Sequence, residues 1–446
     1  MKNSLKQYLD LYRENRELID RNSSNPINAL RQQAADSLEA NGLPAPGSEN
    51  YEITDLDELL APDYGVNVAR VPLDVNPAAS FKCGVPHLST SLFLLVNDSW
   101  AESEHARDLL PEGVEIGSLR DWTAKCETAA RAYGSLASLS DPITALDSLL
   151  VQDGMYLRVK KGVRLSRPLQ LVSILSAPMQ MMSVRRLLII IEEDAEAQLL
   201  VCDHTQNPDV RLMTLQTVEI SVGRNARFDF YDLEESSLLT TRLSSLWLRQ
   251  EEGSNVLIDG MTLFNGTTRN QYHCTFTGEH ASLQLLGMGI EDADRRLDTY
   301  SYVDHTVGHC HTQELFKYVV DGHATGAFAG RIHVAPGAVK TEAYQSNRNM
   351  VGSADARMYS KPQLEIYNDD VKCSHGTTVG QLDPMQVFYM RTRGLSEDEA
   401  RLLLKQAFMA DVIDAVRLPV LKDRIQHLTE RRFSGEAASC ADCGLC

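Results

Sequence analysis

A turn motif that recurs about every 30 residues constrains the fold of this chain more than any other feature. Each copy is a turn with glycine or aspartate, followed by alternating apolar residues. A regular period with only strands between turns predicts a β-solenoid, in which each coil buries its inward face by stacking on the next. The copies begin at Asp194, Gly223, Gly253, Gly278, Gly322 and Gly352.

One interval in this series is longer, at 44 residues from Gly278 to Gly322. We interpret it as a coil with an insertion or as a coil and a half. The alternative to a solenoid is a β-sandwich whose turns happen to be evenly spaced. The sequence thus predicts a mainly β protein with a β-solenoid as its core and helical regions on both sides.

Helical patterns lie at both ends of the predicted solenoid. In residues 1–41, Asn25-Pro26 fits a helix start and Asn41-Gly42 fits a helix end. Near the other end, Ser396 and Glu399 form a capping box for a helix that stops before Pro419. The open end of a solenoid needs covering, so these helices either cap it or dock a partner.

These patterns divide the chain into four parts. We predict an N-terminal region of helices and short strands (1–150), the β-helix core (151–383), a C-terminal helical region (384–433) and a flexible cysteine-rich tail (434–446).

The composition argues against several classes of function. A net charge of −18 disfavours a nucleic-acid partner held through its phosphates. The amino terminus has no apolar signal core, and the most apolar run, Leu187 to Ile191, is far too short to span a bilayer. The nine cysteines are mostly far apart, which indicates reduced thiols in a cytoplasm, with metal or sulfur chemistry available to them.

Common catalytic motifs are missing from the sequence. It contains no G-x-x-x-x-G-K-[ST] phosphate loop, no G-x-S-x-G elbow and no H-E-x-x-H zinc helix. Nothing pairs a nucleophile with an obvious base. We therefore expect a protein that is not an enzyme.

The candidate site with the best-defined local geometry is the pair Cys373 and His375. They lie two residues apart in a short strand, so both side chains point to the same face. A thiol and an imidazole on one face can hold iron, zinc or a sulfur species. Spacing alone favours the plainer alternative, a buried cysteine beside a core histidine.

Two further clusters carry metal-ligating side chains. If residues 305–311 form a strand, His305, His309 and His311 share one face and Cys310 takes the other, as a small buried hydrophobe. The histidines then make either a metal site or a solvated outer face.

The tail carries Cys440, Cys443 and Cys446, whose spacing matches that of iron–sulfur cluster ligands, although a fourth ligand is missing. The alternative is a disordered terminus that merely carries thiols.

From about residue 155 to residue 430, the sequence resembles the SufB/SufD family of iron–sulfur cluster assembly proteins. The version Lys372-Cys373-Ser374-His375-Gly376 is similar to the SufD branch. The other segments that carry the resemblance are Asp304-His305 through Cys310, Glu314 to Lys317, Phe328 to Gly330, Ala338 to Thr341, Gln345 to Asn349, Lys361 to Tyr367, Asp369 to Val371 and Phe388 to Gly394.

The resemblance implies a mainly β fold, a right-handed parallel β-helix flanked by helical regions, and a non-catalytic scaffold subunit in the cytoplasm. Its implied partners are a SufB-type paralogue, or a second copy of the chain, and a SufC-type ABC ATPase that docks on the C-terminal helices. ATP would be used only through that partner. A transient iron–sulfur cluster or iron would form where Cys373 and His375 meet the paralogue. The tail cysteines are not a feature that we associate with the family.

Two other functions remain open at this point. The tail cysteines could serve an iron–sulfur electron carrier, and the β-helix could belong to a polysaccharide lyase. Lyases of this kind are usually exported, so the absence of a signal segment weighs against the second function.

Overall fold

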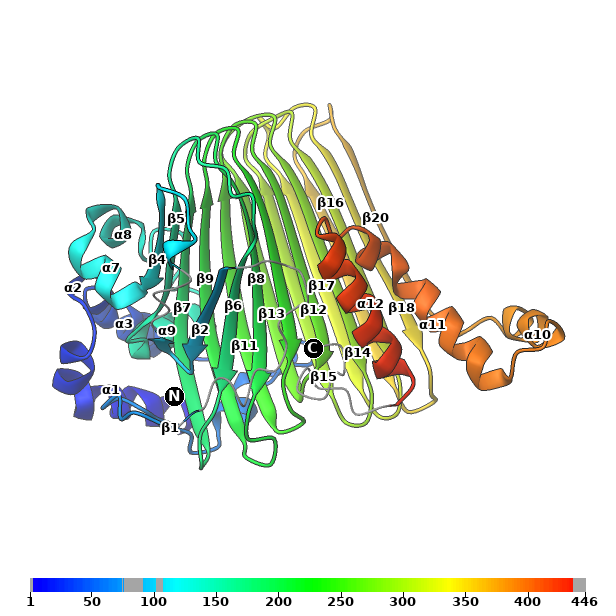
Figure 1. The fold of residues 1–446 in the computed structure, drawn as a ribbon, viewed down its shortest axis with the longest axis horizontal. Helices are drawn as coiled ribbons and strands as arrows, with labels where there is room; N and C mark the ends of the chain where they lie inside the picture. Colours follow the sequence, from blue (N-terminus) through cyan, green and yellow to red (C-terminus); the bar gives the residue numbers. More distant parts are fainter. Residues whose placement is uncertain (1–2, 74, 76–90, 102–106, 436–446) are drawn as a thin grey trace.

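The computed structural model describes residues 3–73, 75, 91–101 and 107–435. Two long sheets face each other and enclose one elongated core, with helices at both ends (Figure 1). The first sheet contains, in spatial order, β19 (Arg357–Ile366), β17 (Thr325–Val334), β15 (Arg296–His305), β13 (Thr267–Phe276), β11 (Thr240–Gln250), β9 (Leu212–Val222), β7 (Met181–Ile191), β5 (Gly154–Val159) and β4 (Val114–Ser118), with β1 (Gly65–Val66) paired to β7.

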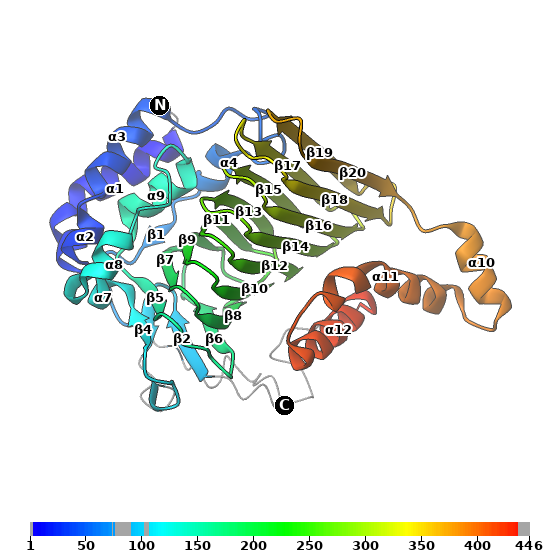
Figure 2. The same cartoon turned by 90° about the horizontal axis from the view of Figure 1, so that it is seen from above.

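The second sheet alternates with the first along the chain, so each coil contributes one strand to each sheet (Figure 2). Neighbouring strands of each sheet are parallel, with two exceptions at the N-terminal end. There β4 pairs antiparallel with β5 in the first sheet, and β3 pairs antiparallel with β2 in the second. This arrangement confirms the predicted β-solenoid. The second sheet contains β20 (Lys372–Gly380), β18 (Glu342–Val351), β16 (His311–Val320), β14 (Ser282–Glu291), β12 (Asn255–Phe264), β10 (Arg227–Glu235), β8 (Glu196–Thr205), β6 (Leu169–Leu175), β2 (Ser91–Val96) and β3 (Ser99–Ala101).

The repeated turns owe their period to one left-handed backbone position in each coil. These positions have φ values of 55° to 66°, which explains the frequent Gly, Asn and Asp there. Gly322 and Gly352 lie in turns at the opposite edge, between β16 and β17 and between β18 and β19. The 44-residue interval is therefore a coil and a half, and the insertion alternative is wrong. The left-handed positions are Asp194, Asn225, Gly253, His280, His309 and Lys340.

Inward-facing side chains of both sheets build a continuous apolar core. Every second residue of each strand points into it, for example Phe228 and Phe230 of β10, and both are almost completely buried. Leu283 and Leu285 do the same in β14. Each such side chain contributes about 1.5–3 kcal/mol of burial free energy, so the stack is stabilised along its whole length.

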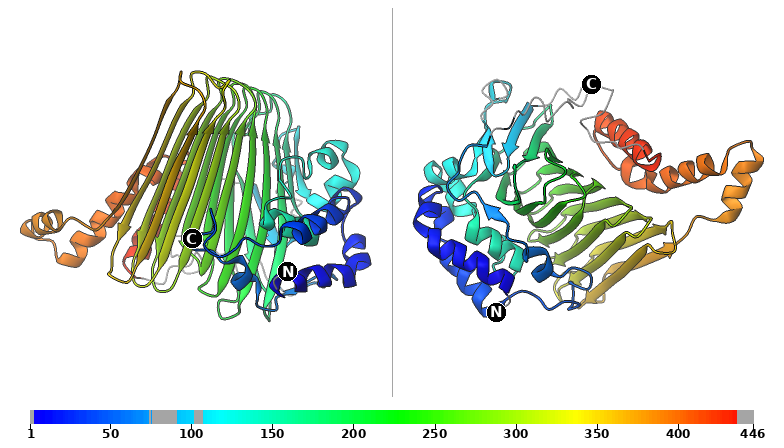
Figure 3. Two further views of the ribbon diagram at one scale, coloured as in Figure 1. Left: turned by 180° about the vertical axis from the view of Figure 1, so that it is seen from behind. Right: turned by 90° about the horizontal axis from the view of Figure 1, so that it is seen from below.

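The N-terminal helices cover the outer face of the first sheet, where α9 packs on β7, β9 and β11 (Figure 3). Buried charges attach α9 to the sheet, since Arg186 of β7 lies 3.6 Å from Asp147 of α9 and also pairs with Glu219 of β9 at 2.9 Å. Ser24 is the N-cap of the helix predicted to start at Asn25, and Gly42 ends the following helix as predicted. These helices are α1 (Asn3–Arg21), α2 (Asn25–Asn28), α3 (Arg31–Asn41), α4 (Leu56–Leu60), α7 (Leu119–Lys125), α8 (Glu127–Ala132) and α9 (Pro142–Leu150).

The C-terminal helices lie against the outer face of the second sheet (Figure 2). These helices are α10 (Pro384–Thr392), α11 (Glu397–Asp414), with the predicted capping box, and α12 (Pro419–Phe433). Lys317 of β16 pairs with Asp411 at 2.5 Å, and Arg417 pairs with Asp229 of β10 at 2.6 Å. Helix α10 instead projects away from the solenoid (Figure 1). Within the described part of the chain, no helix is both long and apolar enough to cross a bilayer.

Candidate functional site

The candidate pair lies on β20, the last strand of the second sheet. Cys373 pairs in register with buried Ala343, and His375 with buried Gln345, so both side chains are on the inward side of the final coil. None of the described strands stacks beyond β20, and Cys373 is half-buried there while His375 is exposed. The plainer alternative of a core histidine is therefore wrong. The strand also continues beyond Gly376 to Gly380.

The open end of the solenoid exposes several large apolar side chains to solvent. Val379 on the inward side of β20 is 52% exposed, and Tyr367 in the preceding turn is 62% exposed. Ile366 of β19 is also exposed. No strand in the described part of the chain pairs with the outer edge of β20. An unpaired edge with apolar neighbours favours pairing with another chain.

The donor atoms fit a shared metal or cluster site. Burial raises the pKa of the Cys373 thiol, so the free chain holds it protonated at neutral pH. Thiolate is the form that binds metal, and binding releases the proton. One sulfur and one imidazole nitrogen leave two positions of a tetrahedral site unfilled. Within the described ranges, no group of three or more His, Cys, Asp or Glu side chains converges to hold a metal ion. A metal site built on this pair would need further ligands from outside the described residues.

The histidine cluster near residue 305 is not one strand, contrary to the expectation. His305 ends β15, His309 is in the following turn and His311 begins β16. His305 is buried, its ring stacks on Phe276 at 4.5 Å, and burial lowers its pKa to about 3. The turn therefore separates the three rings, and His305 is a neutral core residue. Cys310 is buried in the core as expected.

The tail cysteines Cys440, Cys443 and Cys446 lie outside the described residues. Metal or cluster binding by these three cysteines, like the alternative of a terminus that merely carries thiols, stays a hypothesis.

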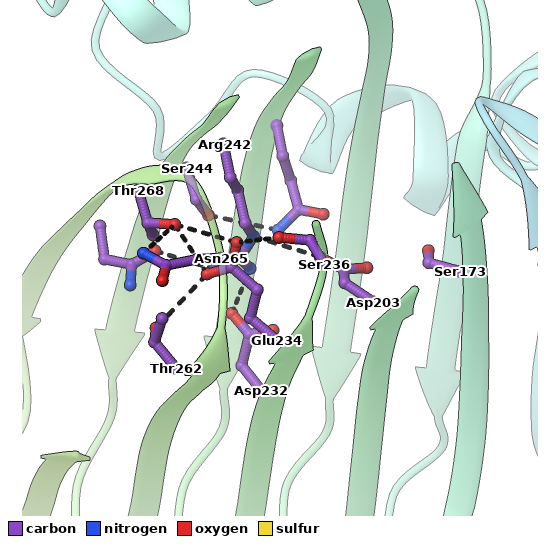
Figure 4. Close-up of polar contacts among 12 residues, drawn as sticks. Ser173, Asp203, Asp232, Glu234, Ser236, Arg242, Ser244, Thr262, Asn265 and Thr268 are labelled. Carbon is purple, nitrogen blue, oxygen red and sulfur yellow. Dashed lines mark hydrogen bonds and ion pairs between the residues drawn. The ribbon is translucent and has the colours of Figure 1, made fainter. Parts of the chain in front are cut away.

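A charged network inside the solenoid escaped the sequence analysis (Figure 4). Arg242 of β11 donates to Asp232 at 2.5 Å, and its Nε lies 3.1 Å from Asp203. Arg185 of β7 donates to both oxygens of Asp203, at 2.6 and 2.7 Å. Thr268 donates to Glu234 at 2.9 Å. These carboxylates are on inward positions of their strands, so both arginines are required as their partners.

We expect Arg242→Met to destabilise the protein by about 3–5 kcal/mol, because it leaves buried carboxylates without their main cation. Urea unfolding measures the loss. The control is Arg227→Met, because Arg227 is exposed and its ion pair with Glu196 is long, at 4.0 Å. We expect this variant to lose about 0–1 kcal/mol of unfolding free energy. Equal losses in the two variants would show that the network does not depend on Arg242.

Another interior carboxyl lies nearer the open end. Glu314 of β16 is fully enclosed, and burial raises its pKa to about 7. Its Oε2 accepts hydrogen bonds from Ser301 at 2.7 Å and from Gln345 at 3.2 Å.

The raised pKa of Glu314 predicts how stability depends on pH. Between an unfolded pKa of about 4.3 and a folded pKa of about 7, the folded state holds a proton that the unfolded state has lost. The free energy of unfolding therefore falls as pH rises through this window and levels off above it. Glu314→Gln should remove up to about 3 kcal/mol of that fall. Urea unfolding at pH 5 and pH 8 tests this, and an unchanged pH dependence would contradict it.

The family and its relatives agree with this architecture. A family model described as the SufBD core domain of the SUF system of FeS cluster assembly matches residues 174–408. A second model, described as the SufBD protein N-terminal region, matches residues 2–171.

Three relatives match the chain over nearly its full length. An iron–sulfur cluster assembly SufBD family protein of Synechocystis is 29% identical, with 90% of each chain covered. The iron–sulfur cluster assembly protein SufD of Escherichia coli is 28% identical, over 91% of this chain and 93% of that protein. SufD of Bacillus subtilis is 24% identical, over 90% and 93% respectively. The chain therefore belongs to the SufBD family of iron–sulfur cluster assembly proteins, and it is similar to members named SufD over about nine-tenths of its length.

Proposed function

We propose that this chain is a non-catalytic, SufD-like scaffold subunit that builds iron–sulfur clusters in the cytoplasm. Its open solenoid end pairs with a SufB-type paralogue, and a SufC-type ABC ATPase docks on the C-terminal helices. A nascent cluster, or the iron for it, is the cargo and is held transiently between the two solenoids. Family membership supports assembly over the alternatives of electron carrier and polysaccharide lyase.

One observation carries this proposal: the two ligand side chains lie on the last rung of the stack. Cys373 and His375 share the inward face of β20, and no coil formed by the described residues covers them. A second solenoid placed against this edge buries the exposed apolar side chains there and adds the missing ligands. The thiol loses its proton only when metal binds, so in the empty site Cys373 stays a weakly nucleophilic thiol.

The C-terminal helices provide a mechanical connection to the ATPase. Lys317 bonds to Asp411 and to the backbone oxygen of Phe408, at 2.5 and 2.7 Å. Arg432 of α12 pairs with Asp292 of the turn after β14. Because such contacts join α11 and α12 to several rungs, a motion of the helices turns the solenoid as a stiff body. ATP binding in the partner would then open or close the contact between the two solenoids.

Co-expression of this chain with its paralogue and ATPase, followed by anaerobic purification, tests the proposal. We expect a stable three-component complex that contains both iron and sulfide. If the chain elutes only as a complex with itself, the partner at the open end is a second copy and not the paralogue. A complex without the ATPase, or without iron and sulfide, would contradict the proposed function.

Deleting residues 440–446 should reduce iron and sulfide less than the loss of Cys373, because the tail lacks a fourth ligand. The same anaerobic analysis measures this, with deletion of residues 436–439 as the control for shortening the chain. Equal losses from the tail deletion and from Cys373→Ser would mean that the tail is as important as the strand site.

A further inference from the structure

A column of polar side chains runs inside the final coils and ends beneath His375. Glu314 of β16 pairs in register with Gln345 of β18, and Gln345 pairs with His375 of β20. One rung earlier the same column holds Leu285, a core residue. The column is therefore closed by apolar packing at its inner end and leads only to the open end of the solenoid.

The amide of Gln345 has a defined orientation. Its Nε2 donates to Glu314 at 3.2 Å, and Ser301 donates to the same carboxyl oxygen at 2.7 Å. Gln345 is only 2% exposed, and among the described residues its Oε1 finds no hydrogen-bond partner. Leaving a buried amide oxygen without a hydrogen bond costs free energy, so Oε1 of Gln345 is available to accept one from a nearby donor.

The opposite strand leaves room for this amide. A Cβ added to Gly330 of β17 would lie 2.4 Å from Nε2 of Gln345 and 2.6 Å from Cζ of Phe328. Gly330 does not have a positive φ, so packing rather than backbone conformation favours glycine here. Any side chain at residue 330 would push the amide of Gln345 away from Glu314.

We propose that Gln345 is a positioning residue for His375: its Oε1 accepts a hydrogen bond from one ring nitrogen of His375, and Glu314 holds the amide in the orientation that offers this oxygen. In-register residues of neighbouring strands are about 4.8 Å apart, within reach of such a bond. Among the described residues, the side chain of His375 makes no hydrogen bond, and its exposed ring is free to turn inward. This inference rests on the proposed role of His375 as a ligand.

The hydrogen bond selects one tautomer of the imidazole. The nitrogen that faces Gln345 carries the proton, and the other nitrogen presents its lone pair to the open end. An imidazole held in this way is ready to bind metal without first rearranging. Gln345 and Glu314 thereby prepare the site before the second chain arrives.

The test uses the full chain alone, labelled with ¹⁵N-histidine, at pH 8. The signals of His375 are identified by their loss in His375→Asn. We expect one dominant tautomer in the wild type and a mixture in Gln345→Leu and in Gly330→Ala. Glu314→Leu should also give a mixture, whereas Glu314→Gln should restore the single tautomer because an amide oxygen still accepts from Gln345.

Gln313→Leu is the matched control, because Gln313 is exposed on the outer side of β16, the strand that carries Glu314. It should leave the spectrum of His375 unchanged. If Gln345→Leu does not fold, the Gly330→Ala variant and the two Glu314 variants still decide the question. A mixture of tautomers in the wild type, or a spectrum unaffected by Gln345→Leu and Gly330→Ala, would overturn the inference.

The proposed function is tested separately in the assembled complex. There, Gln345→Leu should lower the iron content by about 10-fold, the lower range for loss of a residue that orients a metal ligand. If the tautomer shifts as expected while iron and sulfide stay normal, the positioning role stands and the ligand role of His375 fails.

Discussion

Replacing Cys373 with serine is expected to abolish cluster build-up in the assembled complex while the fold stays intact. Serine keeps the size of the side chain, but its hydroxyl does not ionise near neutral pH and is a poor ligand for iron or sulfur species. Cys373 is only half-buried at the end of the stack, so the change should cost less than about 1 kcal/mol of stability. Iron and sulfide should fall by at least about 10-fold.

The measurement is iron and sulfide per complex after anaerobic purification, with the melting temperature recorded in parallel. Cys126→Ser is the control, because Cys126 is also half-buried but lies in the N-terminal helical region. His375→Asn should behave like Cys373→Ser, and His323→Asn, at an exposed turn, should not. Normal iron and sulfide in Cys373→Ser would remove this strand from the mechanism.

The second large effect is expected at α10. Phe388, Tyr389 and Met385 are 60%, 58% and 69% exposed on a helix that projects from the body of the protein. Aromatic side chains in such positions often supply most of the binding energy of an interface. We expect Phe388→Asp to weaken ATPase binding by more than about 30-fold, which corresponds to a loss of about 2 kcal/mol or more.

Binding of the purified ATPase to the variant chain measures this effect, by calorimetry or by co-elution. Met385→Asp should act in the same direction. The control is Met179→Asp, since Met179 is 70% exposed but lies in a turn between β6 and β7. Tight ATPase binding by Phe388→Asp would move the docking surface away from α10. Binding lost in Met179→Asp as well would indicate a general effect on solubility.

Much of the fold was predictable from local patterns. Because each coil needs a turn in a left-handed backbone conformation, the turn residues return at the length of one coil, and that period shows in the sequence. The capping box at Ser396 and Glu399 was predictable for the same kind of reason, since both partners lie within one helical turn.

The candidate site was predictable only in part. The spacing of Cys373 and His375 placed both side chains on one face, as the structure has them. The column beneath them was missed, because Glu314, Gln345 and His375 are each about one coil apart and meet only through strand register. Polar residues that repeat at the coil length were the signal that could have revealed it.

The sequence alone determined the solenoid, its length per coil and the helices at its ends, because turns and helix caps depend on residues close together in the chain. Only the tertiary structure decided which side chains face the interior, that a charged network around Arg242 is buried there, and that β20 is the uncovered last rung. The physical reason is that stacking brings together residues far apart in sequence, and the last coil is exposed because none of the described strands stacks on it.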